Sequence, residues 1–204
     1  MMKTSKQSIL RLFQYRDFLI RLKNINTVNV FSDNLAKDIG TTSIQVRKDF
    51  SLFRLSGNKK AGYKVSNLLK QLDELLGKNK KQKVVIVGAG NIGKALMQYD
   101  GFYKEGLEIA ALFDYDRRKY NHKNNPPVLP IEDLFKFVSS NNVKIGIIAV
   151  PCKAAQQVLD LMISAGIKGA MNFAPIPLKS PKNFYINNIN LRVELESVVY
   201  YTQM

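Results

Sequence analysis

The sequence of 204 residues has few of the side chains from which disulfides, metal sites and membrane spans are built. A single cysteine, Cys152, excludes an intrachain disulfide, and with the single histidine, His122, it leaves no zinc-binding cluster. No apolar run approaches the ~20 residues needed to cross a bilayer. The first residues lack the apolar segment and cleavage site of a secretory signal. We therefore expect a cytoplasmic protein that binds neither a metal nor a membrane.

Acidic residues are also scarce, with 16 Asp and Glu against 31 Lys and Arg. The resulting net charge of +15 is uneven: residues 1–83 carry +12 (18 basic, 6 acidic) and residues 84–204 carry +3 (13 basic, 10 acidic). A basic bias concentrated in one part of a chain indicates a polyanionic partner for that part. Charge alone leaves open a merely solvated basic surface.

The first part of the chain has the pattern of helices with one short hairpin. Ser32 is a suitable N-cap for a helix that Gly40 ends, and residues 41–43 can cap the next one. Helix, glycine-containing turn and helix is the pattern of a helix-turn-helix. The expected elements are helices over 8–22, 33–39, 44–55 and 67–76, with a short strand over 28–31.

Polar side chains gather at the start of the second helix of this pair. In a helix-turn-helix this position meets base edges and phosphates. A basic, turn-rich loop over 57–63 follows and suits a β-wing that reaches phosphate or the minor groove, although a plain soluble hairpin has the same composition. The candidate DNA-binding residues are Ser43, Gln45, Arg47, Lys48, Lys59 and Lys60.

The most informative stretch is VVIVGAGNIG, residues 84–93. A buried strand runs into G-x-G-x-x-G and then into a helix expected over 91–99, as a dinucleotide pyrophosphate requires. Gly88 permits the sharp turn, Gly90 removes a Cβ that would collide with phosphate, and Gly93 lets the helix pack on the strand.

An acid follows this fingerprint at a fixed distance. Asp114 ends the next expected strand, over 109–113, where a carboxylate accepts hydrogen bonds from ribose hydroxyls. This favours NAD(H) over its 2′-phosphorylated form. Arg117 and Arg118 leave the second possibility open, because arginine binds phosphate.

The remainder alternates strands and helices, as a parallel sheet requires. A polar, lysine-rich linker over 77–83 marks the domain boundary. We expect an α/β chain with an N-terminal domain over 1–80, a Rossmann-type domain over 81–188 and a C-terminal helix over 189–204. Its expected elements are helices over 131–139, 152–165 and from Asn190 to about Tyr201, strands over 143–150, 166–172 and 184–187, and a loop over 126–130.

No catalytic constellation is evident. A dehydrogenase needs a proton donor with an orienting partner near the nicotinamide. His122 lies in a polar loop, Cys152 suits a small buried role, and Tyr99 lies at the end of the glycine-loop helix. We therefore expect no catalytic residue.

Seven stretches in order give the chain a resemblance to the Rex family of NADH-sensing bacterial transcriptional repressors. The resemblance covers nearly the whole sequence. The stretches are QVRKDFS (45–51), GAGNIGKAL (88–96), YDGF (99–102), ALFDYD (111–116), VPCKAAQQVLD (150–160), AGIKGAMNFAP (165–175) and the closing helix.

The resemblance implies a homodimer of winged-helix and Rossmann domains, with the C-terminal helix swapped onto the partner subunit. It also implies binding of double-stranded operator DNA at a low NADH/NAD⁺ ratio and release when NADH binds. Carried over by position, Ser43, Arg47 and Lys48 contact DNA from the recognition helix, and Lys59 and Lys60 occupy the wing. The expected NAD(H) contacts are Gly88, Ala89, Gly90, Asn91, Ile92, Gly93, Tyr99, Asp114, Val150 and Pro151.

Departures from the family pattern fall on the wing and the switch. Lys59 and Lys60 replace an arginine and a glycine of the wing motif. The family's aspartate at the start of the swapped helix is Asn190, its N-terminal arginine partner is matched to Arg11, and Leu191 replaces an aromatic residue. The expected switch and dimer residues are Arg11, Tyr99, Asn190 and Leu191.

Two other functions remain open on the sequence. One is an NAD-dependent oxidoreductase with a basic N-terminal domain. The other is a Rex-like DNA-binding protein that has lost its redox response and keeps the Rossmann domain as a dimerisation scaffold.

Overall fold

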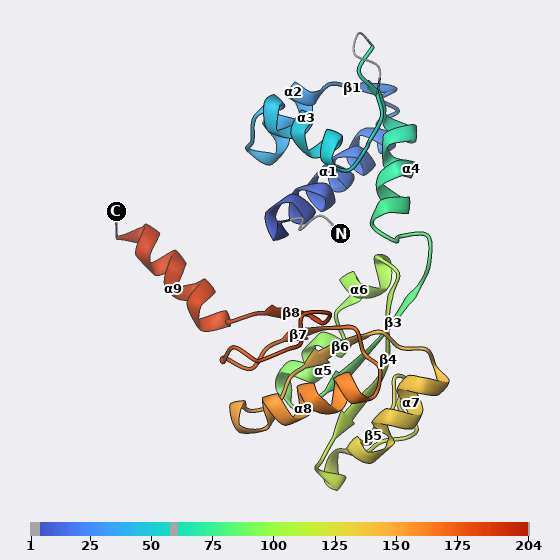
Figure 1. Cartoon of the computed structure of the whole chain (residues 1–204), viewed down its shortest axis with the longest axis vertical. Helices are drawn as coiled ribbons and strands as arrows, with labels where there is room; N and C mark the ends of the chain where they lie inside the picture. The colour runs from blue at the N-terminus through green and yellow to red at the C-terminus, as the bar shows by residue number, and fades with distance from the viewer. Residues whose placement is uncertain (1–4, 58–60, 204) are drawn as a thin grey trace. The chain divides into compact units, whose positions relative to one another are not determined.

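The computed structural model describes residues 5–57 and 61–203, which divide into two compact units, Met1–Lys80 and Lys81–Met204 (Figure 1). The first unit is helical with one two-stranded ribbon. The second unit is a parallel sheet covered by helices on both faces. The wing lysines Lys59 and Lys60 lie outside the described residues.

The first unit contains four helices among its described residues. Gly40 adopts a left-handed backbone (φ 68°) and ends α2, and the Thr42 side chain caps α3. The ribbon forms by antiparallel pairing of β1 with β2. The elements are α1 (Lys6–Asn24), β1 (Asn29–Val30), α2 (Ser32–Ile39), α3 (Ser43–Leu52), β2 (Tyr63–Lys64) and α4 (Val65–Leu75).

One apolar core joins these elements. It takes Leu12, Tyr15 and Leu19 from α1, Leu35 from α2, Val46 and Phe50 from α3, and Leu68 and Leu72 from α4, all at most 1% exposed. The Phe50 ring stands edge-on between Tyr15 and Tyr63, with centroid distances of 5.3 and 5.0 Å. The helix pair α2–α3 and the ribbon are therefore fixed to one frame.

The second unit is built on a six-stranded sheet of order β5-β4-β3-β6-β7-β8, in which every neighbouring pair is parallel. The strands are β3 (Gln82–Val87), β4 (Leu107–Asp114), β5 (Val128–Pro130), β6 (Ile145–Ile148), β7 (Gly169–Asn172) and β8 (Tyr185–Asn188). The other elements are α5 (Asn91–Met97), α6 (Asp100–Lys104), the 3₁₀ turns η1 (Arg117–Lys119) and η2 (Ile131–Asp133), α7 (Leu134–Ser140), α8 (Cys152–Ser164) and α9 (Leu191–Thr202).

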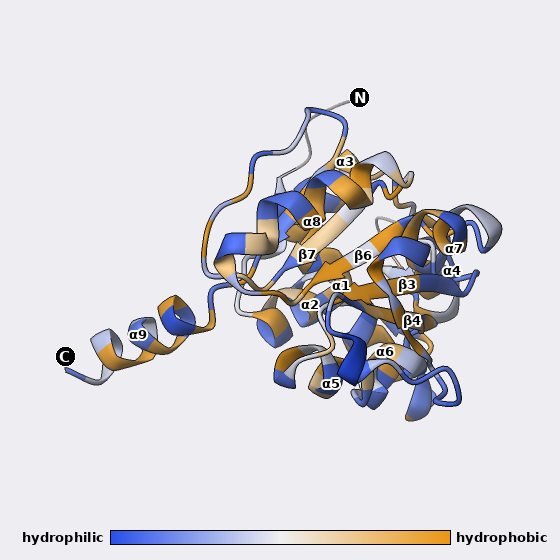
Figure 2. Ribbon diagram, turned by 90° about the horizontal axis from the view of Figure 1, so that it is seen from below, coloured by the Kyte–Doolittle hydropathy of each residue, from blue (hydrophilic) through white to orange (hydrophobic). Residues whose placement is uncertain are grey.

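Alternate residues of the central strand, β3, pack into two separate apolar cores. Val85 and Val87 pack with residues of α7 and α8, whereas Val84 and Ile86 pack on the opposite face with residues of α5 and α6. A strand buried on both faces must be apolar throughout, which is why VVIV has no alternation. Figure 2 shows the central strands coloured as hydrophobic.

Asn172, fully buried at the end of β7, joins two segments. Its amide nitrogen donates to the carbonyls of Ala174 and Ile176 and to Asn188 Oδ1, at 2.9–3.1 Å, and its oxygen accepts from the Ala174 N–H. The loop after β7 and the end of β8 are thereby held by one side chain.

Three expectations from the sequence were wrong in detail. Ser32 is the first residue of α2 and not its cap, because the Asn34 side chain accepts from the Phe31 N–H and moves the start back. The glycine-loop helix ends at Met97 instead of residue 99, and a separate short helix, α6, follows. Residues 128–130, expected in a loop, pair with β4 as an edge strand, where proline is tolerated.

Candidate functional site

A crevice of about 740 Å³ opens at the carboxyl edge of the sheet, where β3 and β6 lie side by side. The chain leaves these two strands in opposite directions, so the loops after them diverge and leave a gap. Its lining includes Gly88 and Gly90 after β3, Asp114 after β4, and Val150 and Pro151 after β6. This is where ligands bind in open α/β sheets.

The glycine turn is shaped by close backbone contacts. Gly88 has φ 108°, and a Cβ there would overlap the Ala149 carbonyl. A Cβ at Gly93 would overlap the Gly88 carbonyl, so this glycine is needed for close packing of α5 on the turn. Gly90 differs: a Cβ there would meet nothing within 4 Å, and the residue lines the crevice. Of these three glycines, only Gly90 leaves open space that a ligand could occupy.

Asp114 is fixed at the crevice by three donors. Oδ2 accepts from the Ala89 N–H at 2.8 Å and from Lys119 Nζ at 2.9 Å, and Oδ1 accepts from the Asp116 N–H at 2.9 Å. Burial raises the pKa of this carboxyl, but the hydrogen bonds, first that of Lys119, outweigh burial, and the net pKa is lowered. The carboxylate is charged at neutral pH and ready to accept from a hydroxyl.

The other predicted cofactor residues divide into two groups. Asn91 and Ile92 line the crevice, whereas Ala89 is buried and contributes its N–H to Asp114. Tyr99 is 60% exposed, stands edge-on to Phe102 and lines a separate hollow with Tyr103. Tyr99 follows the end of α5 at Met97 and precedes α6, and its contact with the cofactor stays a prediction.

Sequence reasoning missed several lining residues. These are Tyr115, Asp116, Lys119, Phe173 and Pro175, and Cys152 also lines the crevice as the first residue of α8. A basic residue shortly after the strand-ending acid is a signal for Lys119. His122 is exposed and is not among the lining residues.

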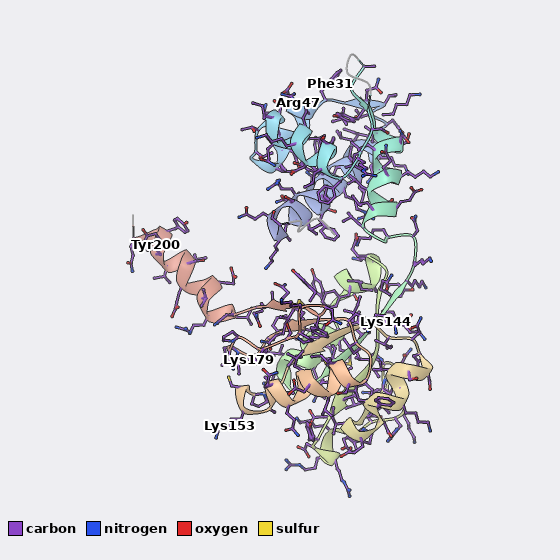
Figure 3. All side chains as sticks on the ribbon, in the orientation of Figure 1. Phe31, Arg47, Lys144, Lys153, Lys179 and Tyr200 are labelled. Carbon is purple, nitrogen blue, oxygen red and sulfur yellow. The ribbon has the colours of Figure 1, made fainter. Side chains whose placement is uncertain are left out.

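The first unit presents the start of α3 at its surface, where Arg47 and Lys48 are exposed. Arg47 donates to Ser32 Oγ at 2.9 Å and to Ser43 Oγ at 3.4 Å, which aligns the guanidinium with the start of α2 (Figure 3). Gln45 instead turns inward, and its side-chain amide donates to Asp49 Oδ1 at 2.9 Å. Arg47 and Lys48 are thus exposed donors on this surface, whereas Gln45 is half-buried, and the DNA contacts of all three residues stay predictions.

Arg11, matched by position to a switch arginine, is committed to the core of the first unit. Nε and Nη2 donate to Asp49 at 2.6 and 2.7 Å, and the Tyr15 hydroxyl donates to the same carboxylate at 2.9 Å. Asn190 is likewise occupied, because its Oδ1 caps α9 by accepting from the Val193 N–H at 3.4 Å. The contact between these two residues that the resemblance implies would join two subunits, so it stays a prediction.

Helix α9 buries no residue in the single chain. Leu191, Leu195 and Val198 are 56–66% exposed and recur at i, i+4 and i+7, so they form one apolar stripe. Tyr200, labelled in Figure 3, adds an aromatic side chain that is 58% exposed.

Two family models match the chain. Residues 3–51 match the model described as a putative DNA-binding protein N-terminus, and residues 79–176 match the model of a CoA binding domain. The redox-sensing transcriptional repressor Rex of Desulforamulus reducens is 39% identical over 98% of this chain and 95% of that protein. The Rex of Carboxydothermus hydrogenoformans is 41% identical over 97% and 96%.

The chain belongs to the Rex family.

Solved structures of RSP, a Rex-family repressor, match throughout. Its complex with β-NAD⁺ and operator DNA is 32% identical, covers 99% of this chain and 94% of that one, and has a TM-score of 0.92. Its complex with β-NADH covers 99% of this chain and 95% of that one, with a TM-score of 0.86. Within residues 5–57 and 61–203, no helix is long and apolar enough to cross a membrane, and no three His, Cys, Asp or Glu side chains gather as a metal site.

Proposed function

We propose that this chain is a redox-sensing repressor that binds operator DNA and releases it when NADH occupies the crevice of the second unit. The observation that carries the proposal is the match, over 99% of the chain, to a Rex-family repressor solved with β-NAD⁺ and operator DNA and also with β-NADH. We also propose that the protein has no enzymatic activity and that it acts in the cytoplasm.

The crevice supports the nucleotide half of this function. The pyrophosphate would lie over Gly88, Gly90 and the start of α5, where no side chain caps the helix among the described residues. Asp114 would accept from the adenosine ribose, and Asn91, Ile92, Val150 and Pro151 would line the remaining length. Tyr99, which lines a separate hollow in the single chain, is included in this proposal only because of its position in the sequence.

The surface of α3 supports the DNA half. Arg47 and Lys48 would meet the duplex, with Ser43 positioning the guanidinium of Arg47. The net charge of +12 on residues 1–83 supplies attraction to phosphates regardless of sequence. We include Lys59 and Lys60 among the proposed DNA-binding residues only because of their positions in the sequence.

The apolar stripe of α9 supports a homodimer in which this helix, residues 189–204, docks on the partner subunit. The swap is part of the proposal. A repressor dimer places two recognition helices on successive major-groove half-sites, and a ligand acts by favouring one spacing over the other.

The test is a titration of full-length protein on a duplex selected from a random library, without nucleotide and with saturating NADH or NAD⁺. We expect tight binding alone or with NAD⁺ and at least tenfold weaker binding with NADH. Equal affinity under all conditions would remove the sensor role and leave a constitutive DNA-binding protein. Failure to select any duplex would remove the repressor role.

A further inference from the structure

Three lysines lie side by side at the amino edge of the parallel sheet, the edge opposite the crevice. They are Lys83 in β3, Lys144 just before β6 and Lys168 just before β7, and we call them the lysine row. The pairing register aligns the residue that follows each lysine with its counterparts on the neighbouring strands, so the three lysines occupy one level. The Lys168 N–H donates to the Lys144 carbonyl at 2.8 Å, which fixes these two residues beside each other.

The charge of the lysine row is not balanced within the chain. All three lysines are exposed, and within residues 5–57 and 61–203 none of them forms an ion pair with Asp or Glu. Lys83 donates to Asn141 Oδ1 at 3.0 Å and has Glu108 as its register partner on β4, so one end of the row is partly balanced. Lys144 and Lys168 have like charges on adjacent strands, which are ~4.8 Å apart, and this arrangement disfavours the folded state.

A purely structural role for these lysines would be to neutralise the ends of helices. Cations near a helix C-terminus stabilise it, but the effect falls off within the last turn. Lys144 follows the last residue of α7, Ser140, by four residues, and Lys168 follows the last residue of α8, Ser164, by four. The row therefore fits an external anion better than it fits the two helix ends.

The connection between the two units favours DNA as that anion. Lys83 follows Leu75, the last residue of α4, by eight residues, which span at most ~28 Å. The segment between them, residues 77–82, adds three lysines and no acid. When the first unit binds a duplex, the lysine row is held close to it, and this raises the effective concentration of phosphate at the row.

We propose that the lysine row is a second DNA-binding surface, in which Lys83, Lys144 and Lys168 bind backbone phosphates of the duplex that α3 contacts. The inference rests on the DNA-binding half of the proposed function. The row adds affinity without reading sequence, because phosphate contacts carry no information on the bases. It also gives the second unit a contact of its own with DNA.

The salt dependence of DNA binding by the full-length protein tests the inference. Fluorescence anisotropy on one long duplex that contains the selected site, without nucleotide and over a range of KCl concentrations, gives the slope of log affinity against log salt. Each lost phosphate contact lowers this slope by about 0.9, so Lys144→Gln/Lys168→Gln should lower it by about 1.8 and weaken binding about tenfold or more at ~0.1 M salt. The thermal transition should not change, whereas a role at the helix ends would lower it.

Lys153→Gln/Lys179→Gln is the matched control, because it removes two charges from exposed positions that follow the carboxyl ends of β6 and β7. Figure 3 labels both residues together with Lys144. The control should keep the wild-type slope, and an equal decrease in both double variants would overturn the inference, since only net charge would then matter. A wild-type slope in Lys144→Gln/Lys168→Gln would also overturn it and leave an acidic protein as the partner of the row. If the wild type binds no duplex, the proposed function itself fails, and the inference with it.

Discussion

Arg11 and Asp49, which are 38 residues apart in the sequence, form a two-pronged ion pair with Nε–Oδ2 and Nη2–Oδ1 distances of 2.6 and 2.7 Å. The Asp49 side chain is 2% exposed. Tyr15 and Gln45 donate to the same carboxylate, so α1 and the recognition helix are joined by one buried charge. The position of Arg47 and Lys48 on the surface depends on this anchor.

Removal of Arg11 should therefore destabilise the first unit strongly. Arg11→Ala leaves the buried Asp49 charge without its cation, and we expect a loss of about 3–5 kcal/mol in unfolding free energy, measured by denaturant titration. Arg21→Ala is the control, because Arg21 also pairs with an aspartate, Asp38, but is 61% exposed. It should cost less than about 1 kcal/mol, and equal losses in the two variants would contradict the prediction.

The same pair predicts a dependence on pH. Burial raises the pKa of Asp49, but hydrogen bonds from Arg11, Tyr15 and Gln45 lower the pKa by more than burial raises it. The net pKa therefore lies below the ordinary 3.8. Because the folded-state pKa is the lower one, this contribution is complete above pH ~4 and is lost as the pH falls through the folded value. Thermal unfolding between pH 7 and pH 2 should show stability declining below pH ~4. An Asp49→Asn variant should be less stable at pH 7 and should lose less on acidification.

The glycine turn offers a pair of substitutions with opposite consequences. Gly90→Ala introduces a Cβ that meets no protein atom within 4 Å, so the protein should fold normally but bind NADH at least tenfold more weakly. Gly93→Ala should lower the unfolding free energy by about 1–3 kcal/mol, because the Cβ overlaps the Gly88 carbonyl. Thermal unfolding and calorimetry of both variants separate the two effects. A destabilised Gly90→Ala protein would show that this glycine is structural.

On the DNA-binding surface, Arg47→Ala should weaken duplex binding by about 1–3 kcal/mol without altering the thermal transition. Lys70→Ala, on α4, removes the same charge from an exposed position outside α3 and should have a much smaller effect. Fluorescence anisotropy on one duplex at fixed salt measures both. If the two losses are the same, binding depends only on net charge and not on α3.

The exposed apolar stripe of α9 predicts that the protein is a dimer. A Leu195→Asp/Val198→Asp variant places two charges in the apolar stripe, and sedimentation velocity should then report a monomer where the wild type is a dimer. Glu196→Gln changes a polar position of the same helix and should remain dimeric. A wild-type monomer would reject the proposed assembly.

Local patterns predicted most of the fold. The VVIV strand, the glycine turn and Asp114 lie within 31 residues, and each has a spacing that follows from strand and helix geometry. The helix-turn-helix was predictable for the same reason, since Gly40 and Thr42 mark its turn.

Contacts between distant segments were not predictable. Nothing in the periodicity of α1 shows that Arg11 pairs with Asp49, and this pairing turns Gln45 away from the surface. Likewise, the position of Tyr99 depends on a helix break after Met97 that no proline or glycine marks. Lys119 reaches Asp114 only because η1 folds back, a turn fixed by the Asp116 side chain.

Asn172 lies between two segments of separate importance. Phe173 and Pro175, which follow it, line the crevice, while its amide also binds Asn188, two residues before the cap of α9. A ligand that displaced the backbone at either lining residue would act on the hydrogen bonds between Asn172 and residues 174 and 176. Such a displacement would be transmitted to the segment before α9 through the hydrogen bond between Asn172 and Asn188.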